Sequence, residues 1–229
     1  MHKLQFLGAS GALALVLLPP VATPRPSSPA RSTIPFDAVS MTIELNSTDA
    51  DAGVILFSDT ESRLRHLTIQ DPSGNVVYEM TSSDAVGLGL TEMQNETAEP
   101  DIQTAFDAYP EGDYTFTGEA FDGTILSSVA HLSHTMPAAP VVSRPEDGAV
   151  LSLHDVRVRW ALDPAIDHYW IEIEQEDPPV NFTMQLQPGV HDFEIPSQLL
   201  RRGASYVAGV GAVAVGGNTT VSEVEFETR

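Results

Sequence analysis

The most constraining feature of this sequence is a series of short segments in which apolar and polar residues alternate. Met41, Ile43 and Leu45 are separated by polar residues, which is the period of a strand with one buried face. Turn-forming residues separate such segments: residues 71–75 read Asp-Pro-Ser-Gly-Asn, and Asp122-Gly123 suits the positive φ angles of a tight hairpin turn. The pattern predicts an all-β chain built largely from hairpins.

One helix and one domain boundary interrupt this pattern. The apolar residues of Asp101–Tyr109 share a face at helical spacing, and Pro100 stands where a first helical turn tolerates proline. The proline-rich connector Pro137–Pro140 predicts a short, stiff link between two domains. We therefore predict an acidic N-terminal β-sandwich domain over residues 37–136 and a second domain over residues 137–229.

The second half carries two specific signals. Trp160 ends the strand-like run Val156–Trp160, and Leu200, Gly203 and Tyr206 have the spacing Leu-x-x-Gly-x-x-Tyr. A tyrosine after such a turn can pack its ring while its hydroxyl reaches the backbone, which is the tyrosine corner of sandwich domains. These residues resemble the fibronectin type III family, and the resemblance implies a β-sandwich without implying a particular activity.

The first half has weaker signals of the same kind. The segments Leu67–Val77 and Pro110–Phe116 look like strands of bacterial immunoglobulin-like modules, and the chain resembles exported bacterial proteins of unknown function. The expected fold class is all-β, with two tandem β-sandwich domains. The first is expected to be immunoglobulin-like with one short helix, and the second fibronectin type III-like.

The N-terminal residues predict export. Lys3 precedes the apolar run Leu4–Leu18, which is shorter than the ~20 residues that span a bilayer and is typical of a signal peptide. We expect a signal peptide over residues 1–30, with a buried apolar strand or helix as the alternative, and a disordered leader over residues 31–36. The chain has no cysteine, which excludes disulfides, thiolate metal sites and a cysteine nucleophile. A secreted or periplasmic protein is expected.

The charge limits the possible partners. The formal net charge is −21, and Lys3 is the only lysine. Such a surface repels nucleic acid and anionic membranes, so we expect no nucleic-acid partner and no membrane insertion after signal removal. An unknown protein or carbohydrate is the expected partner, and a cationic one would suit the charge. A solvated acidic surface without a partner is the alternative.

The best candidate for a site is a calcium loop formed by Asn46, Asp49 and Asp51 ahead of Gly53. Calcium takes several oxygen ligands, and alternate acids before a glycine allow a loop to wrap one ion. The motif is incomplete, because Ala52 stands where an EF-hand would place a third ligand. The alternative is a solvated acidic turn between two strands. We otherwise expect no cofactor, and calcium is the one possibility that the sequence raises.

Motifs for catalysis are missing. The sequence has neither a Gly-x-Ser-x-Gly elbow nor a phosphate-binding glycine loop. His131 and His134 would face opposite sides of a strand. Glu172 and Glu174 share a strand face as a glycosidase pair might, a coincidence expected in so acidic a chain. We therefore predict no catalytic residues and a non-catalytic exported binding or spacer module, not an enzyme. The alternatives are a calcium-stabilised adhesion or carbohydrate-binding protein and a small extracytoplasmic hydrolase.

Overall fold

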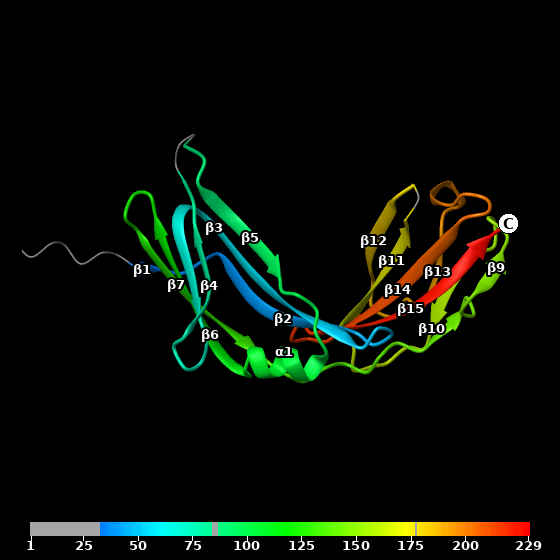
Figure 1. Ribbon diagram of the computed structural model, residues 1–229, viewed down its shortest axis with the longest axis horizontal. Helices are drawn as coiled ribbons and strands as arrows, with labels where there is room; N and C mark the ends of the chain where they lie inside the picture. The colour runs from blue at the N-terminus through cyan, green and yellow to red at the C-terminus, as the bar shows by residue number, and fades with distance from the viewer. Residues whose placement is uncertain (1–32, 84–86, 177) are drawn as a thin grey trace, which may run out of the picture. The chain divides into compact units, whose positions relative to one another are not determined.

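The structure is a computed structural model that describes residues 33–83, 87–176 and 178–229. The predicted signal peptide lies outside the described residues. Strands and short helices follow in the order β1 Thr33–Ile34, β2 Ala38–Asn46, β3 Asp51–Gln70, β4 Val76–Thr81, β5 Leu90–Glu96, α1 Ile102–Ala108, β6 Gly112–Ala120, β7 Ile125–Leu132, β8 Val142–Arg144, β9 Ala149–Leu151, β10 Arg157–Trp160, β11 His168–Gln175, β12 Val180–Leu186, β13 Asp192–Glu194, η1 Ser197–Leu199, β14 Ser205–Val213 and β15 Thr219–Thr228. The predicted all-β class is confirmed (Figure 1).

The first half is organised by one long strand, β3, of 20 residues. Its first part pairs with β2 and β5, and its second part pairs with β4 and β6. The pairing with β5 and β6 shifts register in the segment between Asp59 and His66, so that β3 contributes to two groups of strands (Figure 1). The sequence contains two separate apolar runs here, Val54–Phe57 and Leu64–Gln70, and both lie in this one strand.

The hydrophobic core of the first half lies between these groups of strands. Met41, Ile43, Leu67 and Phe116 are each at most 2% exposed, which matches the alternation that predicts their strands. The predicted helix is confirmed as α1: the carboxylate of Asp101 caps it by accepting from the backbone N–H groups of Gln103 and Thr104. The predicted hairpins β3–β4 and β6–β7 are also present.

The leader expected over residues 31–36 differs from the structure in its described part. Thr33–Ile34 forms β1, which pairs in parallel with β7. Phe36 is 5% exposed and packs edge-on against Phe116. The expectation was wrong for residues 33–36. It rested on the proline and serine content of the segment, whereas the core buries Phe36.

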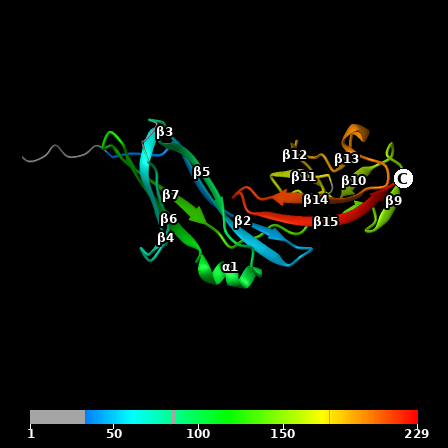
Figure 2. The ribbon, with the colours of Figure 1, turned by 45° about the horizontal axis from the view of Figure 1, so that its top comes forward.

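The second half consists of two facing sheets. One has the order β13-β10-β8, and the other runs β12-β11-β14-β15 (Figure 2). Trp160 is 1% exposed in the core between them, with its ring 5.6 Å from that of Tyr169. The hydroxyl of Tyr206 accepts a hydrogen bond of 2.6 Å from the backbone N–H of Arg201. The sandwich and its tyrosine corner are therefore as the resemblance implies.

The two hydrophobic cores belong to one compact unit, residues 31–229. Strand β15 pairs in parallel with β2, at Thr219–Val221 opposite Glu44–Asn46. The division into domains at residue 137 stays a prediction. In the part of the chain that the structure describes, no helix has the length and apolar character to cross a membrane.

Candidate functional site

The contacts between the two halves form a junction, which we define by β2, residues 133–137 and residues 217–223. Its centre is the side chain of Asn218, which is 3% exposed. The Asn218 Oδ1 atom accepts from the backbone N–H of Ile43 at 2.9 Å. Its Nδ2 group donates to the carbonyls of Ser133 and Thr135 at 2.7 and 3.1 Å. One amide side chain thus satisfies three backbone groups in two segments, β2 and residues 133–137.

Further hydrogen bonds extend the junction on both sides of Asn218. The hydroxyl of Thr220 donates to the carbonyl of Pro137 at 2.8 Å. The backbone N–H of Ser47 donates to the carbonyl of Val221 at 2.9 Å, and the N–H of Glu223 donates to the hydroxyl of Thr48 at 2.9 Å. The turn before Asn218 needs a glycine, because Gly217 has φ +90° and a Cβ there would lie 2.6 Å from Thr42 Cγ2.

The predicted calcium loop lies beside this junction, as the turn that joins β2 to β3. Asn46 Oδ1 accepts from the backbone N–H groups of Thr48 and Asp49 at 2.9 and 3.3 Å. Ala50 adopts φ 61° in the turn, and Asp51 pairs with Asn46 across the hairpin. The structure therefore brings the three predicted residues into one turn, with the Asn46 carbonyl oxygen used by that turn.

Calcium binding itself stays a prediction. Among residues 33–83, 87–176 and 178–229, no group of three or more His, Cys, Asp or Glu side chains has a geometry that could hold a metal ion. His131 and His134 have separate contacts: Nδ1 of His131 lies 2.8 Å from Asp113 Oδ1, and the ring of His134 stacks on Phe106.

Glu44 is the most perturbed acid of the junction. Its pKa is raised from 4.5 to about 7, first by burial and then, in decreasing order, by the carboxylates of Glu96, Glu172, Glu99 and Glu223. Burial also raises the pKa of Glu96 and that of Glu223. Gly53 makes room for this arrangement, since a Cβ there would lie 2.6 Å from Glu96 Oε1.

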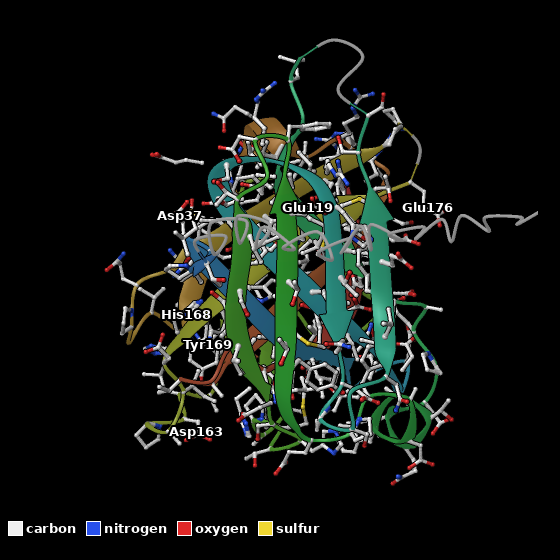
Figure 3. All side chains as sticks on the ribbon, turned by 90° about the vertical axis from the view of Figure 1, so that its left-hand side faces the viewer. Asp37, Glu119, Asp163, His168, Tyr169 and Glu176 are labelled. Atoms are coloured by element: carbon white, nitrogen blue, oxygen red, sulfur yellow. The ribbon has the colours of Figure 1, made fainter. Side chains whose placement is uncertain are left out.

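A hollow of about 350 Å³ opens beside Glu44. We call it the Trp170 hollow, and its lining residues are Glu44, His168, Trp170, Glu172, Thr183 and Gln185. His168, Trp170 and Glu172 alternate along β11, so they share the face of the sheet that points away from the core. Figure 3 labels His168 and Tyr169 at the start of this strand; Tyr169, of opposite orientation, is 3% exposed.

The indole of Trp170 lies against the backbone of β14. Trp170 pairs with Gly211, and a Cβ on Gly211 would be 2.1 Å from the indole Cε2 atom. Only a glycine allows this approach. The half-buried ring is therefore held on the sheet surface beside the polar side chains of the hollow.

The pair Glu172 and Glu174 is cross-linked by neighbours on β12. Asn181 Nδ2 donates to one oxygen of each carboxylate at 2.8 Å, and the Thr183 hydroxyl donates to Glu172 at 2.9 Å. The sequence shows Trp170 and the two glutamates on one strand, but not their proximity to Glu44, because Glu44 comes from β2 across the junction.

Comparisons with known proteins found distant similarity to solved structures alone. A scan of family models found no match, and a search of curated proteins found none either. Among solved structures, the FN1-FN3 domains of chicken CNTN1 are 12% identical with a TM-score of 0.34, over 86% of this chain and 66% of that one. A two-domain fibronectin type III segment of chicken tenascin is 12% identical with a TM-score of 0.33, over 83% and 98%.

A third structure, the BSP domain of a biofilm associated protein, is 12% identical with a TM-score of 0.28, over 83% of this chain and 29% of that one. The chain thus spans less than two thirds of the CNTN1 and biofilm structures. At TM-scores this low they carry no argument of their own, and the fold rests on the strand pairing described above.

Proposed function

We propose that this chain is a non-catalytic binding or spacer module that contacts its partner through the Trp170 hollow. The observation that carries the proposal is the half-buried indole held against Gly211 and surrounded by hydrogen-bonding side chains. A few placed polar groups around an apolar surface are typical of binding sites. A secreted or periplasmic location is part of this proposal.

The chemistry of the hollow suits a protein or carbohydrate partner. The indole offers an aromatic face for a sugar ring or for a cationic side chain. The carboxylate of Glu172, the amide of Gln185 and the hydroxyl of Thr183 lie beside it and can exchange hydrogen bonds with hydroxyl or guanidinium groups.

The test is isothermal titration of the full chain with three probes: a neutral β-glucan, a uronic-acid polymer and an arginine-rich peptide. At least one probe should bind, and Trp170→Ala should lower its affinity at least about tenfold, because aromatic anchors dominate such contacts. Trp170→Tyr should retain part of the affinity. Val150→Ala, at a 49% exposed position on β9, is the matched control and should bind normally.

Equal affinity of Trp170→Ala and the parent chain would contradict a contact at this hollow. Failure of all three probes to bind would leave the spacer role alone. Melting temperatures of the variants show whether a lost affinity comes from lost folding.

A small hydrolase is the second candidate, and one observation favours it. Glu44, with its raised pKa, and Glu172 line the same hollow, and a protonated carboxyl beside an ionised one is the pair that glycoside hydrolysis uses. Release of reducing ends from the β-glucan, lost in Glu44→Gln, would establish this activity in place of simple binding.

A further inference from the structure

One edge strand of the second half lacks the features that usually protect an edge. Within the described residues, the strands with a single neighbour in their sheet are β1, β4, β5, β8, β9, β12 and β13. Four of these have three residues or fewer, β4 carries Glu79, and β5 carries Glu92 and Glu96. Proteins usually protect edges by short length, charge, proline or a bulge. Strand β12, Val180–Leu186, has seven residues with no charge and no proline.

Strand β12 is also regular and open along its whole length. It pairs with β11 through all seven residues without a shift in register, and it is the last strand of its sheet (Figure 1). In the ranges that the structure describes, no backbone group of a loop bonds to residues 180–186. Alternate residues of an antiparallel edge strand direct their N–H and C=O groups away from the sheet. These groups are therefore available to a further strand.

The apolar side chains of β12 are incompletely covered at this edge. Phe182 and Met184 are half-buried and pack against the core of the second half. The ring of Phe182 lies 6.3 Å from that of Phe193, which belongs to β13 of the facing sheet. A strand added beside β12 would cover more of these side chains, and burial of apolar surface favours association.

The residues of β12 suit a second copy of the same strand. Antiparallel pairing about Thr183 engages all seven residues and keeps apolar side chains on one face and polar side chains on the other. Cross-strand pairs of matching character stabilise a sheet, and a methionine sulfur makes favourable contacts with an aromatic ring. The facing pairs are Thr183 with Thr183, Phe182 with Met184, Asn181 with Gln185, and Val180 with Leu186.

Charge also favours this edge for contact between copies. The net charge of −21 makes most surfaces of two copies repel each other. The acids closest to β12 in its sheet are Glu172 and Glu174 on β11, which accept hydrogen bonds from Asn181. Pairing of β12 with β12 would separate the two β11 strands by three strand spacings, roughly 14 Å, which exceeds the Debye length of about 8 Å at physiological salt.

We propose that two copies of this chain form a two-fold dimer by antiparallel pairing of β12 with β12, so that the sheet β15-β14-β11-β12 continues into the second copy. The dimer does not depend on the proposed binding function. Thr183 and Gln185 of β12 also line the Trp170 hollow, and the two-fold axis keeps the same face of both sheets on one side. If the hollow binds a partner as proposed above, the dimer presents two such sites on one face.

The first experiment is sedimentation velocity of the full chain from about 1 µM to 1 mM, because small interfaces are commonly weak. A monomer–dimer equilibrium is expected. It should shift toward the dimer between about 0.02 and 0.5 M sodium chloride, since ions screen the repulsion between two acidic chains. Association of arginines with acids would instead weaken with salt. A monomer at every concentration would overturn the proposal and leave the edge to a strand of another protein.

Charges placed on the two-fold axis test the register. Thr183 faces itself in the dimer, so Thr183→Lys and Thr183→Glu each place two like charges opposite each other. Each variant should dimerise at least about fivefold more weakly than the parent chain, and an equimolar mixture of the two should dimerise at least about fivefold more tightly than either alone. Thr91→Lys, at an exposed position on the edge strand β5, is the matched control and should dimerise as the parent chain does.

Hydrogen–deuterium exchange of the parent chain gives a second readout that needs no substitution. Alternate N–H groups of β12 should become protected as the concentration rises, while those of β5 should not change. Circular dichroism shows whether each variant is folded. The proposal is overturned if Thr183→Lys and Thr183→Glu dimerise like the parent chain, if their mixture is no tighter than either variant alone, or if exchange in β12 does not depend on concentration.

Discussion

At the scale of single residues, each half contains a buried tyrosine whose hydroxyl forms a hydrogen bond with a nearby backbone group. The hydroxyl of Tyr206 accepts from the backbone N–H of Arg201, and the hydroxyl of Tyr114 donates to the carbonyl of Pro110 at 2.9 Å. Both tyrosines are at most 2% exposed. Burial raises the pKa of Tyr114 to about 12, with smaller contributions from Asp71 and Tyr109. The first half thus has its own tyrosine corner, which strengthens the immunoglobulin-like interpretation.

Asn218 provides the sharpest prediction at this scale. Replacement by alanine leaves the N–H of Ile43 and the carbonyls of Ser133 and Thr135 without their partner in a buried place. We expect Asn218→Ala to lower the free energy of unfolding by about 3 kcal/mol, because unsatisfied buried groups are costly. Chemical denaturation monitored by circular dichroism measures this change in the free energy of unfolding.

Asn95→Ala is the control for this substitution. Asn95 is half-buried and donates one hydrogen bond of 3.3 Å to the carbonyl of Glu96, so its loss should cost less than about 1 kcal/mol. A similar cost for both variants would show that Asn218 does not hold the junction as described.

Some of these residues could be identified from the sequence, and others could not. The sequence identifies Trp160 and Tyr206 because their neighbours set a local pattern of strand and turn. Asn218 has no such signal: it follows two glycines and resembles any turn asparagine, although its partner Ile43 lies 175 residues away. The contacts of Glu44 also come from distant parts of the chain, so in the sequence it looks like an ordinary outward-facing polar residue of a strand.

At the scale of secondary-structure elements, hairpins were predictable and strand continuity was not. The turns at 71–75 and at Gly123, with φ +88°, carry residues that fix their geometry. The merging of two apolar runs into β3 depends on partners on both sides of the bend. The sequence pattern does not identify β5, where Met93 is the one residue below a tenth exposed and polar residues dominate.

The prediction at this scale concerns Gly211 of strand β14. Gly211→Ala would drive a methyl group into the indole of Trp170, so the ring must leave its place on the sheet. We expect the free energy of unfolding to fall by about 1–3 kcal/mol, which is typical of overpacking. Denaturation measures the loss, and tryptophan emission should shift to the red as the ring becomes more exposed.

Gly209→Ala is a close control on the same strand. A Cβ at Gly209 would meet Val221, Glu223 and Glu172 atoms at 3.6 to 3.9 Å, which is ordinary contact. This variant should therefore keep the parent fluorescence. A red shift in Gly209→Ala as large as in Gly211→Ala would contradict the packing of Trp170 on Gly211.

At the scale of the whole molecule, two hydrophobic cores and one uneven charge distribution set the behaviour. Between residues 37 and 136, eighteen acidic residues stand against Arg63 and Arg65. The sequence predicted both cores, because alternation is a local property of each strand. The joining of the cores through β2 and β15 depends on tertiary contacts, and no local pattern encodes it.

Added salt should stabilise the molecule. Self-repulsion among acids weakens as ions screen it, so the Tm should rise by several degrees between about 0.02 and 0.5 M sodium chloride. Calcium at matched ionic strength tests the loop prediction. A further rise, lost in Asp49→Ala/Asp51→Ala, would support the site, because ligands of the native state raise its stability. An equal rise with sodium would contradict it.

The pairing of β2 with β15 also has a consequence during synthesis of the chain. Synthesis delivers β2 well before β15, so the edge of β2 at Glu44–Asn46 stays uncovered until β15 has been made. An uncovered edge is a template for strands of other molecules. A chain that stops short of β15 would therefore expose a point of self-association, which the pairing with β15 otherwise covers.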